Sequence, residues 1–184
     1  AKHDIATTMP APDFVGGGQI IYDEAQMREI YEKGRGSVRV RAKYNAVPGE
    51  NMLEITQIPP TTTVEAIMDK ISELVKAGKL KEISDMRDET DLNGLKLTLD
   101  LKRGVDADKL MAKLFKATPL EDSFSANFNI LVSGRPRVMG VREILQEWTA
   151  FRMECVRRRT YYDLHGKEKR LHLLQGLAAI LLDI

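Results

Sequence analysis

The segment Gly34-Arg35-Gly36-Ser37-Val38-Arg39-Val40-Arg41-Ala42-Lys43-Tyr44 alternates between two kinds of side chain. A β-strand turns successive side chains to opposite faces, so this pattern predicts a strand with two chemically different faces. One face holds the polar and cationic positions Arg35, Ser37, Arg39, Arg41 and Lys43. Same-face residues lie roughly 7 Å apart, a spacing at which a row of cations can follow the phosphates of a nucleic-acid backbone.

The same cations have a second interpretation. Lys and Arg on an edge strand prevent it from pairing with the strands of other molecules. The segment alone favours neither interpretation, so the rest of the chain has to decide between nucleic-acid contact and edge protection.

Composition limits the class of protein. The chain has 184 residues, of which 43% are hydrophobic, enough for one domain or for a domain with an appendage. A single cysteine, Cys155, excludes an internal disulfide framework, and neither a signal peptide nor a long apolar span is present. These features predict a reducing, cytoplasmic compartment without membrane contact. Because the net charge is only +1, nucleic-acid contact would depend on local clusters such as residues 133–172, with ten Arg and Lys against five Asp and Glu.

Periodicity predicts an α+β fold, a sheet with helices packed on it. Helices are expected at Asp23–Lys33, Thr61–Ala77 and Asp106–Ala117, each with an apolar face and with polar residues or glycine at its ends. After the basic strand, further strands are expected at Met52–Ile58, Gly94–Lys102 and Phe124–Val132. We expect Met52–Ile58 to pair with the basic strand as a hairpin, and the helices to cover one sheet.

A long helix is predicted from Val141 to the end of the chain. Apolar residues recur at three- and four-residue spacing along it, and it would project as an arm of roughly 60 Å. The sequence ends within an apolar helical stretch, which predicts a fragment of a longer protein. The expected organisation is therefore an opening loop and helix at 1–33, an α/β core at 34–138, and the first part of an arm at 139–184.

Enzyme chemistry is not visible in these residues. His165 and His172 are seven residues apart on a helix, which does not suit a shared metal ion, and His3 and Cys155 add no ligand spacing. The acidic residues around Arg87 are more typical of a hydrogen-bonded turn than of a Mg²⁺ site. Gly16-Gly17-Gly18 lacks the lysine of a phosphate-binding loop. We therefore expect no catalytic, cofactor or metal site here.

Four motifs in this order resemble the A subunits of bacterial type IIA DNA topoisomerases. They are Pro10-Ala11-Pro12-Asp13-Phe14, Gly34 to Ala42, Met86-Arg87-Asp88-Glu89-Thr90-Asp91, and a helix with Glu147-Trp148, Arg157-Arg158-Arg159 and Lys169 to Leu177. The resemblance covers nearly the whole chain and includes both gyrase and topoisomerase IV, with the tryptophan-containing helix nearer to the latter. One departure is Val15-Gly16, where the family usually has Pro-Thr.

The resemblance implies a "tower" domain followed by the start of a coiled-coil arm. The parent protein would work as a homodimer of A subunits together with an ATPase B-type subunit, through which the complex uses ATP and Mg²⁺. It would cleave both strands of DNA through a tyrosine on a winged-helix domain that lies before residue 1. Arg159-Thr160-Tyr161-Tyr162 imitates the family's arginine-tyrosine pair, but this segment lies where the arm begins, and neither tyrosine is expected to be catalytic.

The function implied for this chain is to hold the flanks of the bent gate duplex through phosphate contacts. The predicted contact residues are Arg35, Ser37, Arg39, Arg41, Lys43, Arg135 and Arg137. One alternative is a ribosome- or RNA-associated module, which would need exposed aromatics beside the cations for base stacking. A structural spacer without DNA contact is the other.

Overall fold

The computed structural model describes residues 3–184, so the first two residues of the predicted opening segment lie outside the described part. Its helices are α1 (Ile5–Thr8), α2 (Glu24–Lys33), α3 (Val64–Lys76), α4 (Ala107–Ala117) and α5 (Val141–Asp183). Its strands are β1 (Gln19–Ile21), β2 (Arg35–Arg41), β3 (Lys43–Val47), β4 (Met52–Gln57), β5 (Ile83–Asp88), β6 (Leu97–Leu101), β7 (Glu121–Asn127), β8 (Asn129–Val132) and β9 (Arg135–Val138). The predicted α+β class with a long terminal helix is confirmed.

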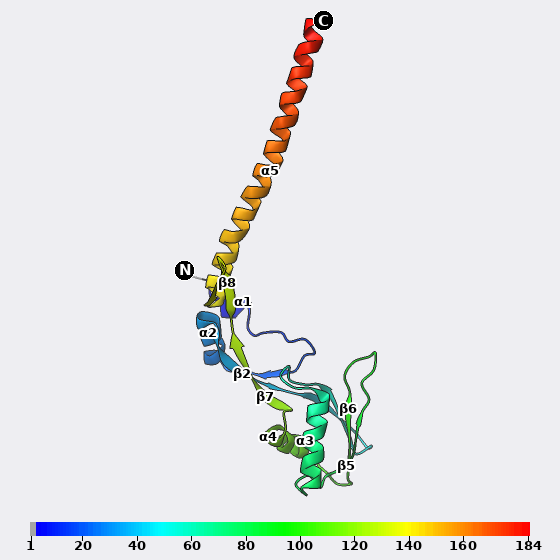
Figure 1. Cartoon of the computed structure of the whole chain (residues 1–184). Coiled ribbons are helices and arrows are strands. Elements are labelled where there is room, and N and C mark those ends of the chain that lie inside the picture. Colours follow the sequence, from blue (N-terminus) through cyan, green and yellow to red (C-terminus); the bar gives the residue numbers. More distant parts are fainter. Residues whose placement is uncertain (1–2) are drawn as a thin grey trace.

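The strands form three antiparallel sheets. One has the order β1-β2-β7, the second β3-β4-β6-β5, and the third is the β8-β9 hairpin. Strands β2 and β7 lie between the base of α5 and the region that contains α3 and α4 (Figure 1). The first sheet therefore connects the arm to the main body.

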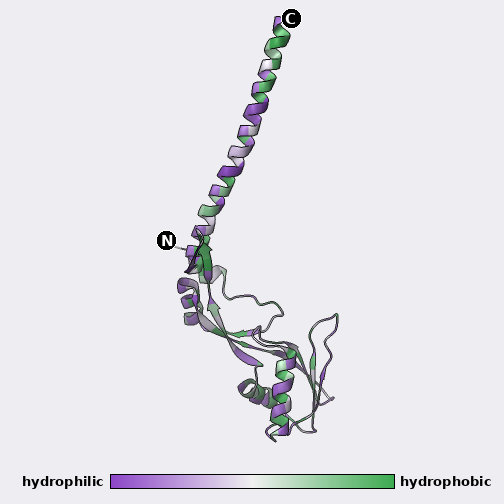
Figure 2. Ribbon diagram, viewed as in Figure 1, coloured by the Kyte–Doolittle hydropathy of each residue, from purple (hydrophilic) through white to green (hydrophobic). Residues whose placement is uncertain are grey.

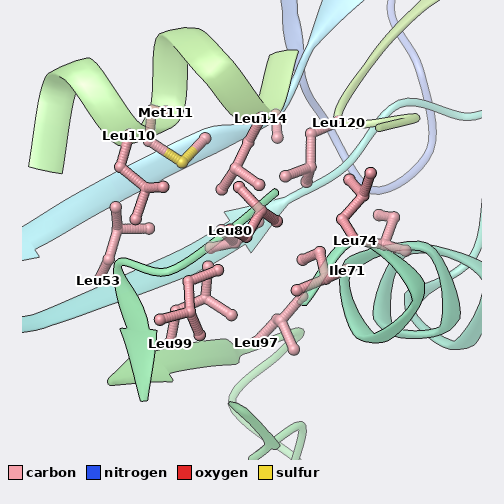
Figure 3. Close-up of a cluster of buried hydrophobic side chains, with 14 of the residues drawn as sticks. Leu53, Ile71, Leu74, Leu80, Leu97, Leu99, Leu110, Met111, Leu114 and Leu120 are labelled. Atoms are coloured by element: carbon pink, nitrogen blue, oxygen red, sulfur yellow. The ribbon is translucent and has the colours of Figure 1, made fainter. Parts of the chain in front are cut away.

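The main body is built on the four-stranded sheet. Helices α3 and α4 bury their apolar faces against one side of it, and the resulting core includes Leu53, Ile71, Leu97, Leu99 and Leu114, all fully buried. Figure 3 shows these side chains converging from both helices and from the strands. Alternation along β4 and β6 supplies the sheet's share of the core, as half-buried strands require.

A second, smaller core lies beneath the three-stranded sheet. Met27, Ile30 and Tyr31 of α2 pack against Val38 and Val40 of β2. The ring of Phe14 meets that of Phe124 edge-on, with 4.9 Å between the ring centroids. This core leaves the opposite face of the sheet free to carry polar side chains.

Helix α5 leaves the body as an arm (Figure 1). Its 43 residues correspond to about 65 Å at 1.5 Å per residue, and none of them is buried. Hydrophobic and hydrophilic residues both occur along its whole length (Figure 2). Within residues 3–184, no helix is both long and apolar enough to span a membrane.

Helix positions were predictable because their end signals are local. Asp23, Thr63 and Asp106 each accept a hydrogen bond from a backbone N–H in the first turn of α2, α3 and α4. Gly34 ends α2 in the left-handed conformation at φ 76°. The three predicted helices are therefore confirmed to within about three residues.

The strand pairing differs from the prediction in two ways. The alternating segment forms two strands in different sheets: the N–H of Ala42 still bonds to the carbonyl of Leu120, just beyond the β2-β7 pairing, and the chain then enters β3. Met52–Gln57 pairs with β3, so the predicted hairpin forms with the end of the alternating segment at Lys43 and Tyr44, and not with the arginine-bearing part of it. The helices also cover more than one sheet, and β1, β5 and β9 were not predicted.

Candidate nucleic-acid interface

The two faces of β2 have the predicted composition. Val38 and Val40 are buried against α2, whereas Arg35, Arg39 and Arg41 are exposed and Ser37 is partly exposed on the other face. The structure thus brings four of the predicted contact residues into one row. We call this exposed side of the β1-β2-β7 sheet the basic face.

Strand β2 lies in the interior of its sheet. It pairs with β7 along its whole length and with β1 from Arg39 to Arg41. Edge protection therefore does not explain Arg39 and Arg41, because the backbone beside them is already paired on both sides.

Neighbouring strands add polar groups to the basic face. On β7, Ser123, Ser125 and Asn127 lie opposite Arg39, Ser37 and Arg35, and all three are exposed. On β1, Gln19 lies opposite Arg41. None of these polar residues was among the predicted contacts, although the alternation from Ser123 to Asn127 was a usable signal. Hydroxyl and amide groups of this kind are common phosphate contacts.

A single carboxylate organises two of the arginines. The Nε of Arg39 donates to Oε1 of Glu121 at 2.8 Å, and the Nε of Arg41 donates to Oε2 at 2.6 Å. The side chain of Glu121 is 11% exposed, whereas those of Arg39 and Arg41 are 54% and 45% exposed. Burial raises the pKa of the Glu121 carboxyl, but the hydrogen bonds from Arg41 and Arg39 outweigh it and leave the pKa below its usual value.

An aromatic pair supports Arg41 from the side of the main body. Its guanidinium carbon lies 4.9 Å from the centre of the Phe115 ring, a cation–π distance. Tyr44 packs on Phe115, and its hydroxyl donates to Asp108 at 2.7 Å. This hydrogen bond, followed by burial, raises the pKa of Tyr44.

The remaining predicted cations lie outside the three-stranded sheet. Lys43 is exposed at the start of β3, where it pairs with Gln57 in the four-stranded sheet. Arg135 and Arg137 are exposed on β9. The β8-β9 hairpin follows β7 directly, next to the end of the sheet at which Arg35 pairs with Asn127. Cations therefore occur on the sheet and beyond both of its ends.

The acidic residues near Arg87 form ion pairs. Arg87 pairs with Asp85, Glu89 and Asp100, and Lys96 pairs with Glu54 at 3.1 Å. In residues 3–184, no group of three or more His, Cys, Asp and Glu side chains is close enough to hold a metal ion.

The tyrosines of the arm are exposed. Tyr161 and Tyr162 lie on α5, and the ring of Tyr161 stacks on that of His165, with 6.0 Å between centroids. Both positions belong to a helix surface that is separate from the basic face.

Fold and basic face together define a class: an antiparallel α+β unit that presents a positively charged sheet face and continues into an exposed helical arm. The family of DNA gyrase and topoisomerase IV A subunits matches residues 1–184. The chain belongs to this family.

Individual relatives agree with the family match. The chain is 35% identical over 183 residues to the DNA gyrase A subunit of Synechocystis sp., an alignment that covers 96% of this chain and 21% of that protein. It is 38% identical over 174 residues to the chloroplastic/mitochondrial DNA gyrase A subunit of Arabidopsis thaliana, covering 92% of this chain and 18% of that protein. The chain spans about a fifth of the length of these relatives.

Proposed function

We propose that this chain holds the flanks of a bent DNA duplex within the A subunit of a type IIA topoisomerase. The observation that supports this most strongly is the row of Arg35, Ser37, Arg39 and Arg41 on the exposed face of β2. At Arg39 and Arg41 this strand is paired on both sides, so the arginines there do not protect an edge. The relatives are named as subunits of DNA gyrase, which favours double-stranded DNA as the partner.

The chemistry of the basic face favours phosphate contact. The basic face carries three guanidinium groups and the carboxylate of Glu121, so its net charge is positive. Serine, asparagine and glutamine side chains lie beside these charges. The face of a three-stranded sheet does not enter a groove as a helix or a two-stranded ribbon does, so we expect no readout of base edges. Binding should therefore be similar for different sequences and strongly dependent on salt.

The role proposed for this chain is mechanical. Strand cleavage, ATP use and pairing with a B-type subunit would belong to the parent assembly, and neither Tyr161 nor Tyr162 would form the covalent link to DNA. The alternative of an RNA-binding module has less support, because Phe115 lies beneath Arg41 and the Tyr44 hydroxyl is bonded to Asp108. Neither ring is free to stack on bases from the basic face.

Salt titration of a duplex tests the proposal in the intact parent protein. Arg35→Ala should lower the slope of log affinity against log salt by about 0.9, and Arg39→Ala with Arg41→Ala by about 1.8, if each arginine contacts one phosphate. Arg35 is the cleaner single change, because among the described residues it has no ion-pair partner that would be left behind.

Lys76→Ala with Lys79→Ala is a matched control, since it removes the same charge from exposed positions at the end of α3. Its salt slope should equal that of the wild type. Slopes that stay unchanged in both arginine variants would remove the proposed function.

A further inference from the structure

Glu121 occupies an unexpected position for a DNA-binding face. It is an acid at the Arg41 end of the cationic row, directly opposite Arg41 in the β2-β7 register and diagonal to Arg39. A carboxylate at this place repels phosphate, so charge alone predicts that it weakens DNA binding. The geometry of its hydrogen bonds with Arg39 and Arg41, in contrast, favours DNA binding.

Glu121 uses only the Nε donor of each arginine. Each of its two oxygens accepts one Nε–H, so the terminal Nη groups of Arg39 and Arg41 are not bonded to it. Among the described residues, none accepts a hydrogen bond from these Nη groups. Since a guanidinium is a rigid planar fork, fixing Nε also fixes the direction of the Nη donors.

The carboxylate is itself held in place. It lies recessed in the sheet at 11% exposure, beneath two side chains that are about half exposed. The Phe115 ring further restricts the plane of the Arg41 guanidinium. Both arginines are therefore ordered before any ligand arrives. An arginine without such contacts would lose its rotamer freedom only on binding, and this loss would weaken the binding.

We propose that Glu121 is a positioning residue that orients the Nη groups of Arg39 and Arg41 toward neighbouring phosphates of the bound duplex. This inference rests on the proposed function, because it concerns how the same face binds DNA. Preorganisation outweighs the repulsion between Glu121 and DNA, so removing the carboxylate weakens binding although it makes the face more positive.

The decisive variant is Glu121→Gln in the intact parent protein. Glutamine has one acceptor oxygen in place of two, and its amide donors face a guanidinium, so it can hold only one of the arginines. We expect duplex affinity to fall about three- to tenfold at constant salt, the loss that corresponds to one or two side chains ordered on binding. Higher affinity with a steeper salt slope would overturn the proposal, and so would unchanged affinity.

Asp122→Asn is the matched control. Asp122 is the adjacent carboxylate on β7, but it bonds to the Thr61 hydroxyl at 2.7 Å and not to either arginine. The charge change is identical, so affinity should stay equal or rise. A loss equal to that of Glu121→Gln would assign the effect to charge or to the strand, against the proposal.

A double-mutant cycle separates this inference from the proposed function. With Arg39 and Arg41 both replaced by alanine, Glu121→Gln should no longer weaken binding, because nothing remains to be oriented. If the arginine variants bind DNA like the wild type, the proposed function fails. If they weaken binding but Glu121→Gln alone does not, only the positioning role fails.

Nuclear magnetic resonance supplies a readout independent of DNA. The Nε–H signals of Arg39 and Arg41 should both exchange slowly with water in the wild type, and at least one of the two should exchange rapidly in Glu121→Gln, while the melting temperature changes little. Equally rapid exchange in both proteins would contradict the ordering on which the proposal depends.

Discussion

At the residue scale, the basic face depends on the opposite orientation of neighbouring side chains in β2. Val40 is fully buried against α2, while Arg39 and Arg41 on either side of it reach solvent. The buried valines fix the strand on its helix, and this fixes the direction of the arginines. Within one strand, the buried valines thus contribute to stability, and the exposed arginines between and beside them are available to bind a ligand.

Val40→Ala tests this division. Removing the two methyl groups from a closed core should lower the free energy of unfolding by about 1–3 kcal/mol, from lost burial and the remaining cavity. Urea denaturation of the chain measures the change. Ser123→Ala, on the exposed side of the adjacent strand, should stay within about 0.5 kcal/mol of the wild type. Equal losses in the two variants would mean that the faces are wrongly assigned.

The orientation of Val40 and Arg39 was predictable from sequence, whereas the role of Glu121 was not. Alternation is a local property, readable within a few residues. The bond between Arg41 and Glu121 joins positions 80 residues apart, and their pairing depends on the register of β2 with β7. The register of two strands so far apart in the chain cannot be predicted from one sequence, so the contact of Glu121 with the arginines was not predicted.

At the element scale, the junction between α2, β2 and α5 links the basic face to the arm. Gly34 ends α2 at φ 76°, and a Cβ atom there would collide with the backbone carbonyl of Met139. A Cβ on Gly140, the residue before α5, would collide with the carbonyls of Tyr31 and Glu32. Two glycines therefore allow the first turn of the arm to sit directly on the end of α2.

Gly34→Ala should cost more stability than a substitution at an ordinary left-handed glycine. The backbone conformation alone costs about 1–2 kcal/mol for a residue with a Cβ, and the collision with Met139 adds to this. Gly78→Ala is the control, because Gly78 has a similar φ of 71° and open space around it. Thermal melts should rank the variants as wild type, Gly78→Ala, Gly34→Ala. Equal melting temperatures for the two variants would exclude the tight junction.

The elements also mark the limit of prediction from sequence. Helices α2, α3 and α4 were located because their caps are encoded by neighbouring residues, such as Asp23 and Gly34. The alternation from Gly34 to Tyr44 predicts a single strand, because it continues without a break through Ala42. Its division between two sheets follows from its partners, because β2 pairs with β7, which is distant in sequence, whereas β3 pairs with β4.

At the scale of the whole molecule, α5 exposes an apolar stripe. Leu171, Leu174 and Leu181 are all about half exposed or more. Exposed apolar surface of this kind favours association with other helices. The 184-residue chain should therefore be monomeric at low concentration and associate weakly, through the arm, as concentration rises.

Sedimentation velocity over a range of concentrations measures this association. Leu174→Lys with Leu181→Lys should abolish it, because charge replaces the apolar contact. Gln175→Lys adds a charge beside the stripe and should have a smaller effect. A tight dimer that survives the double leucine variant would mean that the chain associates through another surface.

Site-specific crosslinking tests the DNA-holding role most directly. Ser125 is exposed on the basic face, opposite Ser37, and a photoreactive p-benzoylphenylalanine can replace it in the intact parent protein. Leu92, fully exposed on the turn between β5 and β6, serves as the control position away from the basic face. On irradiation with bound duplex, we expect crosslinks to DNA from position 125 and not from position 92. Crosslinks from position 92 alone would contradict the assignment of the basic face as the surface that holds DNA.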